Sequence, residues 1–231
     1  MGYKLTWMYI WQTKIRPTWW QPWANTVWYR PLTSVTEWTD QSWNGYDLSG
    51  SYRTFGTYGW VDCVYVSGWS NSDARLYNSS IPIGTNRTAS IWFYSTTSNI
   101  AQWVICTWHD YINSIIWSWI YSSNLPYVTD WKTHDELWTW NILNAWHLMT
   151  VTYDGTTAIL YIDGTENTRY NYTRTSDTAI AFSHKTYYDW GSQYSERFEW
   201  YLSEAIYEDK TWTQQEVSDY FDLTKSAYWV S

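Results

Sequence analysis

Carboxylate pairs are the first residues in this sequence to consider for chemistry. Retaining glycosidases break a glycosidic bond with two carboxyl groups about 5 Å apart, and a strand can supply both if they occupy alternate positions. No Asp or Glu in the chain has another Asp or Glu two positions away. The pairs Asp163 with Glu166 and Glu196 with Glu199 are three positions apart, so they would face opposite sides of a strand. This pattern argues against a glycoside hydrolase of that type.

The sequence also lacks the patterns of nucleophilic or zinc catalysis. Its four histidines, His109, His134, His147 and His184, are scattered, and no Gly-x-Ser-x-Gly motif surrounds a serine. The spacing of a zinc site is missing as well. His147 follows a tryptophan at the start of an expected strand, so we interpret it as a structural residue. The sequence therefore predicts a protein that is not an enzyme.

The segment Asp40-Gln-Ser-Trp-Asn44 carries the kind of ligands that calcium prefers. Hard cations take several oxygen ligands, and loops rich in Asp, Asn and backbone carbonyl groups supply them. Asp40 and Asn44 are therefore candidate calcium ligands. The alternative is an Asx turn, in which Asp40 accepts hydrogen bonds from nearby amides and no metal is involved.

Size and charge limit the classes of protein to which this chain can belong. Its 231 residues suffice for one large β-domain or two small domains. The formal net charge of −8 opposes contact with nucleic acid or an anionic membrane. No apolar run approaches the roughly 20 residues that span a bilayer. We therefore expect neither a nucleic-acid partner nor insertion into a membrane.

Short β-branched and aromatic runs, broken by Asn, Asp, Ser and Gly, predict an all-β protein. Residues 89–97 are expected to form a buried strand. The runs 147–153 and 157–162 flank Asp154-Gly155, a pair suited to a tight hairpin turn, and Asp163-Gly164 ends the second run in the same way. The sequence therefore predicts antiparallel pairing in this region.

A single short helix is expected near the C-terminus. Thr213-Gln-Gln-Glu216 fits a capping box, in which the threonine hydroxyl and the glutamate carboxylate each accept from the other residue's amide. An apolar stripe at helical spacing follows, made of Val217, Tyr220, Phe221 and Leu223. This helix is expected to pack on the β-structure.

Several segments in the same order resemble the laminin-G-like, concanavalin A-like jelly-roll family. They are Asp40-Gln-Ser-Trp-Asn-Gly-Tyr-Asp-Leu, Ser90-Ile-Trp-Phe, Trp146-His with Thr150-Val-Thr-Tyr-Asp-Gly, Leu160-Tyr-Ile-Asp-Gly-Thr, and Phe198-Glu-Trp-Tyr-Leu-Ser-Glu-Ala with Thr213-Gln-Gln-Glu. The resemblance implies a two-sheet antiparallel jelly-roll sandwich with one short C-terminal helix. It implies a domain over residues 28–226, after an extended segment or linker (1–27) and before a short tail (227–231).

The resemblance also bears on the calcium site. In jelly rolls of this kind the first and last strands often lie side by side, which would bring Glu204 near Asp40. Asp40, Asn44 and Glu204 are therefore the candidate calcium ligands, with the ion in a structural role.

Tryptophan is unusually frequent, at 23 residues, and glycine is scarce, at 10. Trp43 and Trp200 stand where the family pattern has glycine, and other tryptophans stand where turn geometry favours a small residue: Trp60, Trp69, Trp117, Trp119 and Trp190. We interpret many of these as UGA codons read as glycine in the source lineage, a hypothesis that 23 UGG codons would contradict. The alternative is a truly Trp-rich sandwich with aromatic loops for stacking on sugars. Trp92 and Trp146 fall where the family itself has tryptophan.

The two cysteines, Cys63 and Cys106, lie in apolar, strand-like segments. Buried free thiols are the usual state of such cysteines. The alternative is a disulfide, which would require the two strands to be adjacent and would indicate an oxidising compartment.

These observations together favour a lectin-like binding module. It would recognise carbohydrate or another extracellular ligand, such as a protein, as part of a larger surface or secreted protein. The first alternative is a structural adhesion or spacer domain without a small ligand. A glycoside hydrolase would need two carboxylates that converge despite their separation in sequence.

The predicted calcium site can be tested by measuring the melting temperature. A ligand that binds only the native state raises the melting temperature. Calcium is therefore expected to raise the melting temperature of the protein, as followed by thermal unfolding with calcium and with a chelator. Equal melting temperatures would remove Asp40, Asn44 and Glu204 as candidate ligands.

Overall fold

A computed structural model of the chain describes more than half of the sequence. The described residues are 27–29, 38, 40, 42, 44–48, 53–68, 76–96, 102–108, 117–120, 126–129, 142–171, 179–184 and 198–230. The expected N-terminal segment therefore lies outside them up to residue 26, as do Trp43, Trp69, Trp190 and the last residue of the tail, Ser231.

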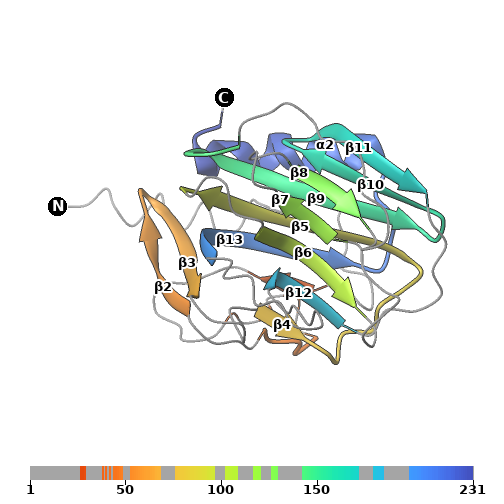
Figure 1. Cartoon of the computed structure of the whole chain (residues 1–231), viewed down its shortest axis with the longest axis horizontal. Helices are drawn as coiled ribbons and strands as arrows, with labels where there is room; N and C mark the ends of the chain where they lie inside the picture. The colour runs from red at the N-terminus through yellow and green to blue at the C-terminus, as the bar shows by residue number, and fades with distance from the viewer. Residues whose placement is uncertain are drawn as a thin grey trace, which may run out of the picture.

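The described residues form two antiparallel sheets and one α-helix, which confirms the predicted all-β sandwich with a short C-terminal helix (Figure 1). The larger sheet has the order β11-β10-β9-β5-β13-β3-β2, with β1 also paired to β13, and the smaller has the order β4-β12-β6-β7-β8. The strands are β1 (Val27–Tyr29), β2 (Arg53–Tyr58), β3 (Val61–Gly68), β4 (Leu76–Asn78), β5 (Asn86–Ser95), β6 (Gln102–Trp108), β7 (Trp117–Ile120), β8 (Pro126–Thr129), β9 (Trp146–Asp154), β10 (Thr157–Ile162), β11 (Thr165–Asn171), β12 (Ala179–His184) and β13 (Phe198–Glu208).

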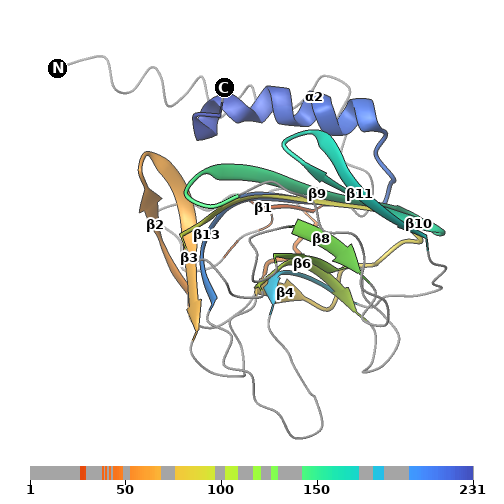
Figure 2. The ribbon, with the colours of Figure 1, turned by 45° about the horizontal axis from the view of Figure 1, so that its top comes forward.

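Strand β5 has hydrophobic side chains on both of its faces, because it is covered on both sides. Ile91 and Phe93 point into the core between the two sheets, and Trp92 points to the opposite face of the larger sheet. On that outer face the helix α2 (Gln214–Thr224) and the 3-10 helix η1 (Lys225–Tyr228) cover a second core. Figure 2 shows α2 across the outer face, with β4, β6 and β8 on the opposite side of the larger sheet.

Both predicted hairpins form, but only at Asp163-Gly164 do both residues of the pair take positive φ angles. Asp163 and Gly164 have φ angles of 51° and 77°, which suits the two-residue loop between β10 and β11. Gly155, with φ of 93°, follows Asp154 between β9 and β10. A Cβ atom at residue 164 would come within 3.1 Å of the Phe221 Cβ atom, so this glycine also lets α2 approach the turn closely.

The capping box of α2 is confirmed, but the predicted apolar stripe is wrong at one position. The Thr213 hydroxyl accepts from the Glu216 amide, and the Glu216 carboxylate accepts from the Thr213 amide. Val217, Tyr220 and Thr224 are buried, whereas Leu223 is 36% exposed. Positions 217, 220 and 224 recur at the helical spacing of three and four, and 223 lies one position off that stripe.

The 3-10 helix η1 adds a buried side chain, Tyr228, beyond the end of α2. The packed structure therefore extends into the segment 227–231. No described helix is long and apolar enough to cross a membrane.

Cys63 is a free thiol, buried on β3 of the larger sheet. Cys106 lies on β6 of the smaller sheet, so the two strands are not neighbours as the disulfide alternative required. Burial raises the pKa of the Cys63 thiol to about 12, although a hydrogen bond from the Tyr58 backbone lowers it in part. The Cys63 side chain therefore stays protonated at neutral pH.

The described tryptophans differ widely in their surroundings. Trp200 is fully buried, with its ring 5.0 Å from that of Phe93, so the core accommodates an indole there. Trp117 and Trp119 lie within strand β7, and the expectation that they occupy turns is wrong. Trp60 is in the turn between β2 and β3 but has no positive φ angle, because the neighbouring Gly59 adopts it, at 64°.

Among the described tryptophans, Trp229 has the backbone that most favours glycine. It ends η1 with φ of 61°, in the left-handed region, and its side chain is 76% exposed. A left-handed conformation costs a residue with a Cβ atom about 1–2 kcal/mol.

Trp229→Gly is therefore expected to raise the free energy of unfolding by about 0.5–1 kcal/mol, once the greater flexibility of the unfolded glycine chain is subtracted. Urea titration measures this change. Trp60→Gly is the matched control, because Trp60 is 87% exposed and has no positive φ angle. If Trp229→Gly lowered the free energy of unfolding as much as Trp60→Gly does, the strain at Trp229 would be contradicted.

Candidate functional site

The predicted calcium ligands lie in two places. Asp40 and Asn44 belong to the segment enclosed by the antiparallel bridge between Trp38 and Leu48. The Asp40 carboxylate accepts from the amides of Ser42 at 2.8 Å and Tyr46 at 3.2 Å, and Asn44 donates to the Ser42 hydroxyl at 3.2 Å. Asp40 and Asn44 are thus joined through Ser42, in the arrangement of an Asx turn.

Glu204 lies on the outer face of the larger sheet, beneath α2. Its carboxylate accepts from the Tyr220 hydroxyl at 2.5 Å, and its amide donates to the Tyr228 hydroxyl at 3.3 Å. Across the described ranges, no group of three or more His, Cys, Asp or Glu side chains could hold a metal ion. Calcium binding by Asp40, Asn44 and Glu204 stays a prediction.

His147 forms a close pair with Asp163. Its Nδ1 atom lies 2.7 Å from the Asp163 Oδ2 atom, and the other carboxylate oxygen accepts from the Leu148 amide at 2.9 Å. The carboxylate therefore ties the β10–β11 turn to the start of β9. This contact gives His147 the structural role expected from the sequence.

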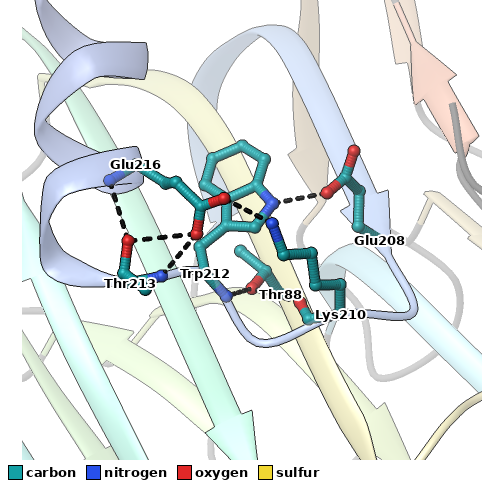
Figure 3. Close-up of polar contacts among 6 residues, drawn as sticks. All are labelled: Thr88, Glu208, Lys210, Trp212, Thr213 and Glu216. Carbon is teal, nitrogen blue, oxygen red and sulfur yellow. Dashed lines mark hydrogen bonds and ion pairs between the residues drawn. The ribbon is translucent and has the colours of Figure 1, made fainter. Parts of the chain in front are cut away.

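Two more carboxylates hold the connection between β13 and α2 (Figure 3). Glu208 is buried and accepts from the Trp212 indole at 2.5 Å. Glu216 pairs with Lys210 and caps α2. Burial by itself raises the pKa of Glu216, but Lys210 and the Thr213 amide outweigh it and lower the pKa overall.

Thr88 completes this connection from the neighbouring strand β5. Its hydroxyl donates to the Lys210 carbonyl at 2.7 Å and accepts from the Trp212 amide at 2.8 Å. The start of α2 is therefore attached to the larger sheet through both β13 and β5. The carboxylates of Glu204, Glu208 and Glu216 are used in holding the helix.

Four aromatic residues stand in one line across the outer face of the larger sheet. Tyr65 on β3 is in register with Tyr201 on β13, Tyr201 with Tyr94 on β5, and Tyr94 with Trp146 on β9. Adjacent ring centroids are 4.9 Å, 6.2 Å and 5.7 Å apart in that order. We call Tyr65, Tyr201, Tyr94 and Trp146 the aromatic row.

Tyr58, at the end of β2, packs on the middle of the aromatic row. Its ring is stacked on Tyr201 with a centroid distance of 4.0 Å and lies 4.5 Å from Tyr94. A hydrogen bond with Tyr58, together with burial, raises the pKa of Tyr94 to about 12. The Tyr94 hydroxyl therefore remains neutral through the physiological pH range.

The aromatic row begins where the helical cover ends. Trp146 is buried against Tyr228 of η1, with ring centroids 5.3 Å apart, whereas Tyr65, Tyr94, Tyr201 and Tyr58 are half-buried. Their rings are thus fixed by neighbours but reach the surface in part. Such a surface combines apolar aromatic rings with hydroxyl groups, a combination suited to a partly apolar ligand.

Sequence reasoning missed the aromatic row, because it searched for carboxylates, histidines and tryptophans. The four residues are separated by 29 to 55 positions along the chain, and only the strand register brings them together. Tyr65 and Tyr201 each stand between two buried residues in the sequence, and this alternation indicates that each tyrosine faces the opposite side of its strand. It did not indicate which strands are adjacent.

Solved structures of low sequence identity share this fold. Trypanosoma rangeli sialidase in complex with sialic acid matches with a TM-score of 0.68 and 8% identity, over 89% of this chain and 34% of the sialidase. The binding domain of botulinum neurotoxin DC in complex with SialylT matches with a TM-score of 0.62 and 13% identity, over 88% of this chain and 51% of that chain. The chain thus spans a third to a half of these proteins, and the likeness supports the β-sandwich fold alone. No protein-family model and no curated protein matches the sequence.

The raised pKa of Tyr94 can be measured directly. Because folding raises this pKa, the neutral hydroxyl stabilises the fold below about pH 10, and the contribution is lost as the pH rises toward about 12. In NMR spectra of protein labelled at tyrosine Cζ, the Tyr94 signal, assigned by its loss in Tyr94→Phe, should stay in the protonated position at pH 11. The substitution Tyr58→Phe should lower the pKa of Tyr94, because it removes the hydrogen bond. If Tyr94 titrated near pH 10 in both the unaltered protein and the Tyr58→Phe variant, the hydrogen bond between Tyr58 and Tyr94 would be contradicted.

Proposed function

We propose that this domain is a non-enzymatic, lectin-like module that binds carbohydrate through the aromatic row. The observation that carries the proposal is the alignment of Tyr65, Tyr201, Tyr94 and Trp146 across four adjacent strands. Sugar rings have an apolar face of C–H groups, which packs on aromatic rings, and hydroxyl groups, which pair with tyrosine hydroxyls. A row of tyrosines offers both.

The packing of the row also favours binding. Tyr201 contacts Tyr58, Tyr65 and Tyr94, so its ring has little freedom left to lose when a ligand binds. A rigid site avoids part of the entropy cost of ordering side chains. The rings are attached to strands rather than loops, which keeps their spacing constant.

Similar folds support a carbohydrate ligand. The sialidase structure contains sialic acid, and the toxin binding domain contains SialylT. Cell entry of botulinum neurotoxin type C, whose structure matches at 15% identity with a TM-score of 0.59 over 85% of this chain and 50% of that chain, depends on two ganglioside molecules. These ligands belong to those proteins, and they indicate that this sandwich occurs in glycan-binding chains.

The placement of the carboxylates supports a binding module over an enzyme. Glu204 and Glu208 are buried beneath α2 in hydrogen bonds with Tyr220 and Trp212. A hydrolase would need such groups in an open cleft beside the sugar. The module is proposed to act outside the cell, as part of a larger surface or secreted protein, where glycans or glycosylated proteins are its partners.

A glycan array tests the proposal, with purified protein probed with and without calcium. The unaltered protein is expected to bind a defined set of glycans, and Tyr65→Ala is expected to weaken that binding roughly tenfold, through loss of one stacking surface. Tyr65 lies at the end of the aromatic row, so its removal disturbs the packing least. Titration calorimetry with the strongest glycan measures the change.

The matched control is Tyr170→Ala, because Tyr170 is a half-buried tyrosine of the same sheet on the distant strand β11. It should bind the glycan as the unaltered protein does. Equal losses in both variants would show a general effect on folding and would remove the aromatic row as the site. Silence across the array would leave the structural spacer as the better account.

A further inference from the structure

We infer that Tyr58 and Tyr94 form an oxidative cross-linking site, at which a haem peroxidase with hydrogen peroxide joins the two phenol rings into dityrosine. The modification is separate from carbohydrate binding, because it needs only the two tyrosines and the oxidant. Three features favour it: the distance between the rings, the contact between their hydroxyl groups and their partial exposure.

Tyr58 and Tyr94 come from strands that are not neighbours. Tyr58 ends β2, whereas Tyr94 is on β5, with β13 and β3 between these two strands in the larger sheet. Both rings nevertheless pack against the second core on the outer face, and their centroids are 4.5 Å apart with 51° between the ring planes. The ring centres of two directly bonded phenols have a similar separation, so coupling requires the rings to rotate more than to move together.

The hydroxyl groups of Tyr58 and Tyr94 also meet, in the hydrogen bond that helps to raise the pKa of Tyr94. Dityrosine forms between the ring carbons next to the hydroxyl groups, so this hydrogen bond brings the reacting carbons toward each other. Tyr201 is placed differently, because its ring is stacked on Tyr58 at 4.0 Å with only 25° between the planes. The new bond lies in the plane of each ring, and stacked rings do not point their edges at each other. Tyr94 is therefore the partner of Tyr58.

The coupling balances with one molecule of hydrogen peroxide. Each tyrosine gives up one electron and one proton and becomes a phenoxyl radical, and the two radicals join through a carbon–carbon bond next to their oxygens. The hydrogen atom on each bonded carbon then moves to the oxygen, which restores both phenols. The two electrons and two protons reduce the peroxide to two molecules of water. Because the fold holds the two rings in contact, a radical on one ring has its partner at a high effective concentration.

Partial exposure makes the pair accessible to an oxidant in solution. Tyr58 and Tyr94 are both half-buried, so their neighbours hold the rings in place while part of each side chain reaches the surface. The product would join β2 to β5 covalently and close the loop of chain between residues 58 and 94. Such a cross-link restricts the unfolded chain, and the cross-linked protein is therefore expected to melt at a higher temperature.

Oxidation of the full chain at low concentration by a haem peroxidase and hydrogen peroxide tests the inference, with mass spectrometry of tryptic peptides from the monomer. Trypsin places Tyr58 in the peptide 54–75, Tyr94 in 88–132 and Tyr201 in 198–210. The expected product is 54–75 joined to 88–132, lighter than the two peptides by two hydrogen atoms and formed only with peroxide. Joining of 54–75 to 198–210 alone, or no joined peptide, would overturn the inference.

Phenylalanine variants identify the two residues that couple. Tyr58→Phe and Tyr94→Phe each remove one hydroxyl and keep the ring, so each is expected to lose the joined peptide. Tyr201→Phe is the matched control, because Tyr201 packs in the same cluster but is not a member of the pair, and the joined peptide should persist in it. Persistence in Tyr58→Phe, or loss in Tyr201→Phe, would overturn the inference. Glycan binding is not a readout here, so the proposed function stands or fails separately.

Discussion

The stacking of Trp92 on Tyr228 is the contact on which the outer face of this protein depends. The two rings lie 4.0 Å apart and within 9° of parallel, and the Trp92 indole donates to the Thr224 hydroxyl at 3.1 Å. Trp92 is on the central strand β5, whereas Thr224 and Tyr228 are on α2 and η1, so the contact attaches the C-terminal helices to the middle of the sheet. Because the helices end there, they cover one part of the outer face and leave the aromatic row at its edge. An aromatic pair of this kind contributes about 0.5–1.5 kcal/mol beyond the area it buries.

Most of the fold could be predicted from the sequence, because its signals are local. The Asp163-Gly164 turn needs only two neighbouring residues with positive φ angles, and the capping box of Thr213 and Glu216 needs four. The error at Leu223 has a local cause as well, since that residue is apolar but one position off the buried stripe. The expectation of a turn at Trp117 and Trp119 is wrong because the pairing of β7 with β6 and β8 places both residues in a strand. Pairing with neighbouring strands overrides the local preference of single residues.

The candidate site could not be predicted, because strand register creates it. Tyr65, Tyr94 and Tyr201 are ordinary strand residues in the sequence, and their alignment depends on which strands are neighbours. Tryptophan drew attention to sugar stacking, but the half-buried stacking residues are tyrosines. Trp200 is buried in the core, and Trp60 and Trp229 are exposed at turns. The hypothesis that some tryptophans are glycines in the source therefore concerns different positions from the three tyrosines of the site.

The central claim is that carbohydrate binds on the outer face of the larger sheet. A crystal structure of the domain with an oligosaccharide selected on the array tests it most directly, because it shows where the ligand lies. We predict a sugar in contact with Tyr65, Tyr94 and Tyr201, with its apolar C–H groups toward the aromatic rings. A ligand bound at the opposite side of the sandwich, or at the Asp40–Asn44 loop, with the aromatic row uncovered, would contradict the account.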